Sequence, residues 1–161
     1  MKSRIRYSRF ATAVTVVVYC LLFAGCIATV RDERAFFILL AIYLTLIVGG
    51  LLYGPAYVEV DKDNIILGSL LRRKKITLRD VESVELFRPT MGAIRIFASG
   101  GFMGYWGIFK EGDIGRYYAF YGKSSDCFLV RMKNGDKYVV GCENPDDIIT
   151  YASSHIGSRL K

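Results

Sequence analysis

Two long runs without charge, separated by only four residues, constrain the fold of this chain most. Residues 10–30 and 35–53 contain no Asp, Glu, Lys, Arg or His. As helices rising 1.5 Å per residue, they span roughly 28 to 32 Å, about the thickness of the hydrocarbon core of a bilayer. The sequence therefore predicts two transmembrane helices in an antiparallel hairpin, residues 10–54, with the charged residues 31–34 as its loop. Pro55 then ends the helical region, because proline lacks an amide hydrogen and clashes with the preceding turn.

The basic residues around these runs predict the orientation of the hairpin. Four of them lie in the tail formed by residues 1–9, whereas the loop carries two arginines. The more basic flank of a membrane helix usually stays in the cytoplasm, and an even number of crossings returns the chain to the same side. We therefore expect a multi-pass membrane protein with both termini in the cytoplasm.

A basic start followed by an apolar run also describes a signal peptide. In addition, Leu22–Cys26 resembles the cleavage box of a lipoprotein, with small residues just before a cysteine. The apolar run continues beyond Cys26, however, and a second run follows immediately. This continuity favours a transmembrane helix over a cleaved leader.

Small residues recur at helical spacing in both runs, at Ala24 and Ala28 and at Ala41, Thr45 and Gly49. In lipid, such stripes let helix backbones approach closely. Two interpretations remain open: the stripes pack the hairpin on itself, or they form the interface of a homo-oligomer.

After Pro55 the hydrophobic pattern becomes that of strands. Short runs of β-branched and aromatic residues, separated by turn residues, predict about seven antiparallel strands in a barrel or sandwich. A C-terminal helix is expected from about residue 145, because Asn144 is a good cap and proline suits the first helical position. Residues 55–161 are therefore predicted to form one mainly-β domain with a C-terminal helix.

The last predicted hairpin turns at Asn134-Gly135, a preferred pair for a type I′ turn. Counting outward from this turn places Cys127 opposite Cys142. Directly paired residues lie within disulfide reach, although cytoplasmic thiols are expected to stay reduced. The sequence thus predicts a cross-strand pair of thiols.

Glycines and aromatic residues alternate over Ser99–Phe109, and a second run of this kind follows at Gly115–Ala119. This pattern resembles the glycine–aromatic signature of a family of bacterial PH-like (pleckstrin-homology-like) domains found in small membrane proteins. The resemblance covers about residues 56–155. It implies a PH-like barrel ending in a helix, in a protein of the bacterial inner (cytoplasmic) membrane, and it implies little chemistry.

Two groups of residues are expected to meet the lipid surface. The glycine-rich segment predicts a tight loop holding large rings, which either fold back on the barrel or enter the bilayer interface. A basic run, predicted as a hairpin tip, is either simply solvated or in contact with anionic lipid. The residues concerned are Phe102, Tyr105, Trp106, Arg72, Arg73, Lys74 and Lys75.

The formal net charge of +7 does not indicate nucleic-acid binding, because much of the basic excess lies beside the membrane runs. Residues with catalytic potential are few. The sequence has a single histidine, His155, near the end of the last predicted helix, and it has no CxxC motif. We expect no enzymatic activity, no metal, no cofactor and no nucleic-acid partner.

These features predict a membrane-anchored, non-enzymatic interaction module. Its partners would be membrane lipids and a protein, either a different one or a second copy of itself. The alternative is an accessory subunit of a membrane-associated enzyme or of an envelope transport or assembly complex.

Overall fold

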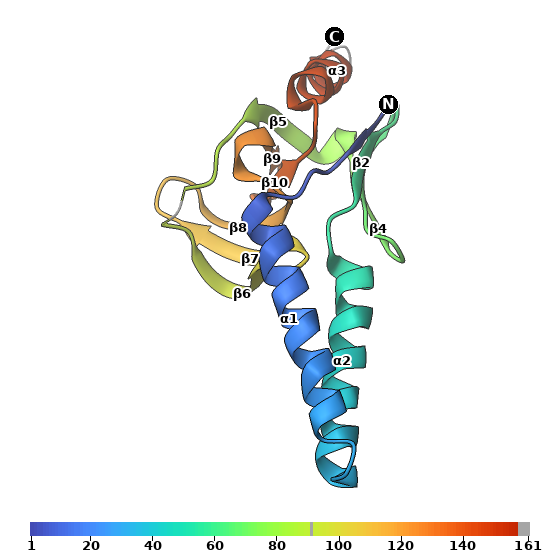
Figure 1. The fold of residues 1–161 in the computed structure, drawn as a ribbon. Helices are drawn as coiled ribbons and strands as arrows, with labels where there is room; N and C mark the ends of the chain where they lie inside the picture. The colour runs from blue at the N-terminus through green and yellow to red at the C-terminus, as the bar shows by residue number, and fades with distance from the viewer. Residues whose placement is uncertain (91, 158–161) are drawn as a thin grey trace.

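The computed structural model describes residues 1–90 and 92–157. Two long antiparallel helices, α1 (Arg9–Ala28) and α2 (Glu33–Tyr53), lie side by side and project from a β-rich domain (Figure 1). Both are long and apolar enough to cross a membrane. In the most apolar 18-residue stretch of each helix, only 11% and 6% of the residues are buried by the rest of the chain. A helix that is apolar all round needs lipid or a protein core around it. The described chain does not supply that core.

The loop between the helices lies earlier than predicted. The Oδ1 atom of Asp32 accepts a hydrogen bond from the amide of Ala35 over 3.3 Å, so Asp32 caps the start of α2. Because α1 already ends at Ala28, the connection consists of residues 29–32 instead of 31–34.

The first residues form a strand, which the prediction of a basic tail did not include. This strand, β1 (Lys2–Arg4), pairs antiparallel with β2 (Tyr57–Val60), and the amino group of Met1 donates to the carbonyl of Val60 over 2.7 Å. Ile5, just beyond β1, is buried in the core. Charged and inward-facing residues alternate along this segment, which is the two-residue period of a half-buried strand. The alternation is visible in the sequence, but it covers too few residues to distinguish a strand from a tail.

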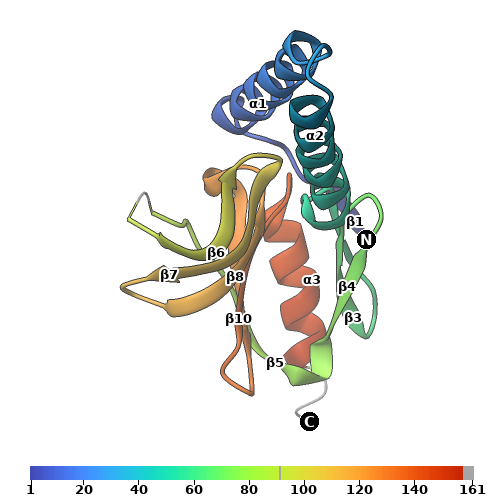
Figure 2. The same cartoon turned by 90° about the horizontal axis from the view of Figure 1, so that it is seen from below.

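The remaining elements complete two sheets and a final helix. They are β3 (Asn64–Gly68), β4 (Arg73–Thr77), β5 (Val81–Leu86), β6 (Ile94–Gly101), β7 (Gly104–Glu111), β8 (Gly115–Tyr121), β9 (Cys127–Met132), β10 (Lys137–Gly141) and α3 (Pro145–Gly157). One sheet has the order β1-β2-β3-β4, and the other has the order β5-β9-β10-β8-β7-β6. α3 lies at the end of the domain farthest from the helix pair (Figure 1), and Figure 2, seen from the side of the helices, shows it behind the opening between the two sheets.

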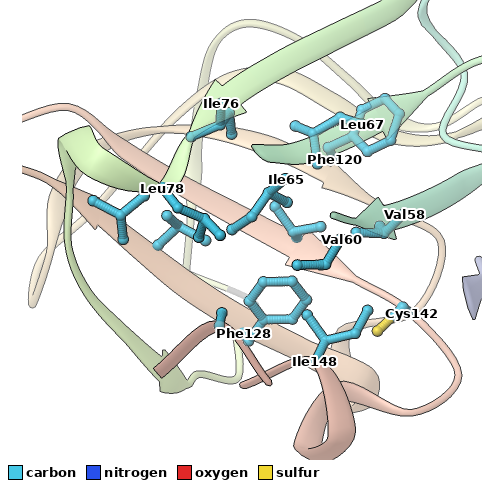
Figure 3. Close-up of a cluster of buried hydrophobic side chains, with 14 of the residues drawn as sticks. Val58, Val60, Ile65, Leu67, Ile76, Leu78, Phe120, Phe128, Cys142 and Ile148 are labelled. Atoms are coloured by element: carbon cyan, nitrogen blue, oxygen red, sulfur yellow. The ribbon is translucent and has the colours of Figure 1, made fainter. Parts of the chain in front are cut away.

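The main hydrophobic core lies between the sheets and is closed by α3. Val58 and Ile65 from the first sheet, Phe128 from the second and Ile148 from α3 are fully buried (Figure 3). On α3, Ala152 is also fully buried and lies four residues after Ile148, on the same face of the helix. The helix starts at Pro145, as predicted.

The described residues after Pro55 form nine strands, compared with about seven predicted, and one pair, β8 and β10, is parallel. The glycine–aromatic segment accounts for part of the difference, because it forms most of a β-hairpin rather than a loop. Gly101, Gly104 and Gly107 have φ angles of 123°, 84° and 108°. Glycine adopts such angles without steric cost, so these positions permit a tight turn and a sharp bend within paired strands.

The last hairpin is present, but its predicted register was wrong by one residue. Cys127 pairs with Gly141, not with Cys142. A type I′ turn requires positive φ at both Asn134 and Gly135, whereas only Gly135 adopts it, at 88°. The hairpin therefore closes with a three-residue loop. The two thiols are free and lie in separate apolar clusters, so they do not form the predicted pair.

These thiols are expected to be unreactive in the folded protein. Burial raises the pKa of Cys127 and raises that of Cys142 from about 9 to about 11, while the thiolate is the reactive form. We expect a water-soluble maleimide at pH 8 to modify both residues only after unfolding, as measured by mass spectrometry. Because the unfolded thiols lose their protons first, stability should fall as the pH rises from about 9 to about 11. Rapid modification of folded protein at pH 8 would contradict this expectation.

Candidate lipid-facing site

The turn between β3 and β4 reaches the end of α2. The predicted charged tip at Arg72–Lys75 was misplaced, because the turn comes earlier and its exposed end is formed by Leu70 and Leu71. The amide of Leu71 donates to the carbonyl of Leu51 over 3.0 Å. This bond satisfies one of the carbonyls left free at the end of the helix and fixes the apolar turn to α2.

The predicted cations do not form one cluster, because those on β4 alternate between its two faces. Arg73 and Lys75 are exposed on the outer face. Lys74 points inward, and its Nζ atom lies 4.5 Å from the ring centre of Tyr118 and 4.6 Å from that of Tyr138. Rings at these distances attract an ammonium group and hold it in place.

Tyr53, the last residue of α2, is the centre of a group of aromatic and basic side chains. The Arg72 guanidinium lies 5.2 Å from its ring centre, and the Trp106 ring stacks with it at 5.5 Å and an interplanar angle of 16°. The Nε1 atom of Trp106 donates to the carbonyl of Phe102 over 3.3 Å. The Phe102 ring lies 5.3 Å from Tyr19 of α1. These contacts join the β6–β7 hairpin to both helices.

The β6–β7 turn is wedged against the helices. The amide of Met103 donates to Thr15 Oγ1 of α1 over 2.8 Å. The side chain of Met103 packs on Gly50 of α2, where an added Cβ atom would lie 3.0 Å from Met103 Cγ. Tyr105 points elsewhere and stacks on Tyr121 at 4.9 Å. The rings of this segment are therefore divided between the barrel and the helices.

A groove of about 930 Å³ lies between the β6–β7 hairpin and α2. Thr45, Gly49 and Tyr53 of α2 form one wall, and Phe97 and Trp106 belong to the other. The lining is mostly apolar, and the side chain of Phe97 is 82% exposed. We call this cavity the junction groove.

A smaller pocket lies next to the junction groove, and Tyr53 and Tyr118 line both cavities. The pocket adds Ser69, Arg72 and Lys74, and we call it the cationic pocket. Among the described residues, no Asp or Glu lines either cavity, and neither cation takes part in an ion pair. An apolar groove beside a pocket that holds two cations and no acidic side chain fits a molecule with an apolar body and a negative head.

The small residues predicted to pack the helices lie mostly on the outside of the hairpin. Ala24, Ala28 and Ala41 are exposed, so they do not pack α1 on α2. Thr45 and Gly49 line the junction groove instead. The homo-oligomer interface stays a prediction.

The buried carboxylate of the β domain has a structural role. Glu111 is 5% exposed, and its two oxygens accept hydrogen bonds from the amide of Thr90 over 2.9 Å and from the hydroxyl of Tyr117 over 3.3 Å. Burial and this carboxylate raise the pKa of Tyr117. The bonds tie the β5–β6 connection to the sheet. Within residues 1–90 and 92–157, no group of three His, Cys, Asp or Glu side chains is arranged to hold a metal.

A model of the bacterial PH domain family matches residues 56–156. The chain belongs to the bacterial PH domain family. The PH domain thus covers both sheets apart from β1, and it includes nearly all of α3. The predicted fold, an apolar helix pair followed by a PH-like β domain with a C-terminal helix, is confirmed. The family is generally non-catalytic. No curated protein and no solved structure matches this PH-domain chain.

Sequence reasoning identified Arg72, Lys74 and Trp106 but missed Tyr53 and Tyr118, the rings that connect them. Tyr53 carried a signal, because a tyrosine at the end of a transmembrane segment is typical of the membrane interface. Nothing in the sequence distinguishes Tyr118 from the neighbouring aromatic residues of its strand.

Proposed function

We propose that this chain is a membrane-anchored, non-enzymatic interaction module whose PH domain is seated on the lipid surface beside its own anchor. The observation that carries the proposal is the fixed attachment of the domain to the helix pair. The strand β1 leads directly into α1, Leu71 bonds to the end of α2, and Met103 bonds to Thr15 of α1. A domain attached at three places presents one constant face to the bilayer.

Exposed apolar side chains on that face support the proposal. Leu70, Leu71 and Phe97 are 67%, 65% and 82% exposed. They belong to the β3–β4 turn and to β6, which lie at the end of the domain nearest the helices (Figure 1). Large apolar side chains gathered beside a membrane anchor are typical of a surface that is buried in lipid.

The proposed orientation places both termini on the cytoplasmic side of a bacterial inner membrane. Four basic residues precede or begin α1, against two at the other end of the helix pair, Arg31 in the loop and Arg34 in the first turn of α2. Since β1 pairs with β2, the N-terminal segment and the PH domain share one side of the membrane. The positive-inside rule assigns that side to the cytoplasm.

A protein partner is the second candidate, and one observation favours it. β6 is the last strand of its sheet, and no described strand pairs with its outer edge. Its residues Ile94 and Phe97 are strongly exposed. A free edge of this kind accepts an added strand from another chain, as an accessory subunit of a larger complex would require.

Spin labels on the full chain in lipid nanodiscs test whether the domain is seated on the bilayer. We would replace the exposed thiol Cys20 by serine and label Leu71→Cys, with Glu82→Cys on the distant strand β5 as the control. Power-saturation EPR compares collisions with oxygen, which concentrates in lipid, and with a water-soluble nickel complex. The label at position 71 should meet mainly oxygen, and the label at position 82 mainly nickel.

Equal exposure of the two labels to nickel would reject the seated domain. The protein-partner function would then take precedence, with cross-linking from β6 in the native membrane as the next measurement.

A further inference from the structure

We propose that the junction groove and the cationic pocket together bind one anionic phospholipid of the adjoining leaflet. Its acyl chains occupy the groove, and its phosphate lies at Arg72 and Lys74. This inference rests on the proposed function, because a lipid reaches the site only if the domain is seated on the bilayer.

The apolar part of the site extends along α2 into the membrane. Its wall runs from Tyr53 to Thr45, eight residues of helix, or about 12 Å at 1.5 Å per residue. One leaflet contributes about half of a 30 Å hydrocarbon core, so the groove matches most of the depth of a single leaflet. Gly49 deepens it, since no atom lies within 4 Å of where its Cβ would be. An acyl chain fits this length and polarity.

The polar part of the site lies where a headgroup would be. Arg72 and Lys74 line the pocket next to Tyr53, at the end of α2, while the groove follows the helix away from them. The rings of Tyr53, Tyr118 and Tyr138 hold the two cations in position without neutralising their charge. Phosphate oxygens are strong acceptors for both types of side chain. Two positioned cations in a pocket that no Asp or Glu lines attract an anion from outside the chain.

Lipid is favoured over a peptide as the occupant because the groove shares its wall with a transmembrane helix. Residues of α2 that line the groove lie next to exposed residues of the same helix, such as Leu44 and Val48. The surface that meets the bilayer is therefore continuous with the inside of the groove. A lipid enters by moving sideways within its leaflet, without leaving the membrane.

The single tryptophan of the chain, Trp106, lines the groove and reports on its occupant. In nanodiscs, bromine atoms on acyl chains quench tryptophan on contact. We would compare brominated phosphatidylglycerol with brominated phosphatidylcholine at equal low mole fraction, using the full chain. The anionic lipid should quench Trp106 more strongly, and the preference should fall by about fivefold for each site cation removed.

Matched variants separate a site from general attraction between charges. The double variant Arg72→Ala/Lys74→Ala should lose the preference for the anionic lipid. The control Arg73→Ala/Lys75→Ala removes the same charge from the same segment but from exposed outer positions, and it should keep the preference. Gly49→Leu fills the groove where there is open space, and it should reduce quenching by both lipids. Thermal unfolding of each variant verifies that it is folded.

Equal quenching by both lipids in the unsubstituted chain would overturn the phospholipid site while leaving the seated domain intact. The same holds if the two double variants lose the preference equally, since only surface charge would then be involved. Absence of quenching by either lipid would reject the site, and in combination with a nickel-accessible label at position 71 it would reject the proposed function as well. Cross-linking of two copies through Phe97→Cys with Trp106 unquenched would assign the groove to a second chain.

Discussion

Replacing Gly107 by alanine is expected to destabilise the protein by about 2 to 5 kcal/mol, the sum of backbone strain and overpacking. Its φ of 108° is unfavourable for any residue with a side chain. A Cβ atom at this position would also lie 2.4 Å from the carbonyl oxygen of Phe97 on the paired strand. The β6–β7 hairpin would have to open to relieve the contact. The shift in Tm, measured in detergent by circular dichroism, gives the size of the effect.

Two other glycines are matched controls: Gly115 lacks the close contact, and Gly112 lacks both the close contact and the positive φ. Gly115 has a φ of 73° but open space around its Cβ position, so alanine there should cost only the strain, about 1 to 2 kcal/mol. Gly112 has neither positive φ nor a nearby atom, and alanine there should change stability by no more than about 0.5 kcal/mol. If the three variants unfold at the same temperature, the hairpin geometry given for Gly107 is incorrect.

Replacing Ile5 by aspartate is expected to release the N-terminal strand from the sheet. Ile5 is 7% exposed and belongs to the main core with Val58 and Val60. Burying a carboxylate there lowers the free energy of unfolding, and the lost packing of the isoleucine lowers it by a further amount of about 2 to 5 kcal/mol. The chain exposes the carboxylate to water with the smallest loss of folding free energy by detaching β1 from β2. Hydrogen exchange with mass spectrometry should show that the amides of β1 and β2 lose protection.

Arg4→Asp provides the comparison, since it introduces the same carboxylate one residue earlier at an exposed position. The β1–β2 hydrogen bonds should stay protected in this variant. Equal loss of protection in both would mean that charge in the tail, rather than burial of Ile5, controls the strand.

Local rules were sufficient for the elements that are defined by long or strongly marked segments. The helix pair follows from two charge-free runs, and α3 follows from its cap and from Pro145. The pairing of Cys127 could not be predicted, because it depends on the φ angle that Asn134 adopts, and both hairpin types accept that sequence. β1 has the alternation of a strand but only three residues, which is too little to distinguish it from a tail.

The site itself was only partly predictable, for a different reason. Its residues come from segments far apart in the chain: Trp106 meets Tyr53, and Met103 meets Thr15. Composition indicated that aromatic and basic residues would be near a membrane. It did not indicate that the β6–β7 hairpin would contact the helices, since that contact depends on the packing of the whole domain.

The pairing of β1 with β2 has a consequence for how the protein is made. These two strands are neighbours in one sheet, yet both long apolar helices lie between them in the chain. The helix pair is thus an insertion into a single β-hairpin. During synthesis the first strand stays unpaired until β2 has left the ribosome, and in the proposed topology both helices enter the membrane before that point. A chain whose first segment was carried across the bilayer would have no β1 on the side where the sheet assembles. Under the proposed topology, completion of the sheet would therefore require correct insertion, and wrongly inserted copies would lack the native fold.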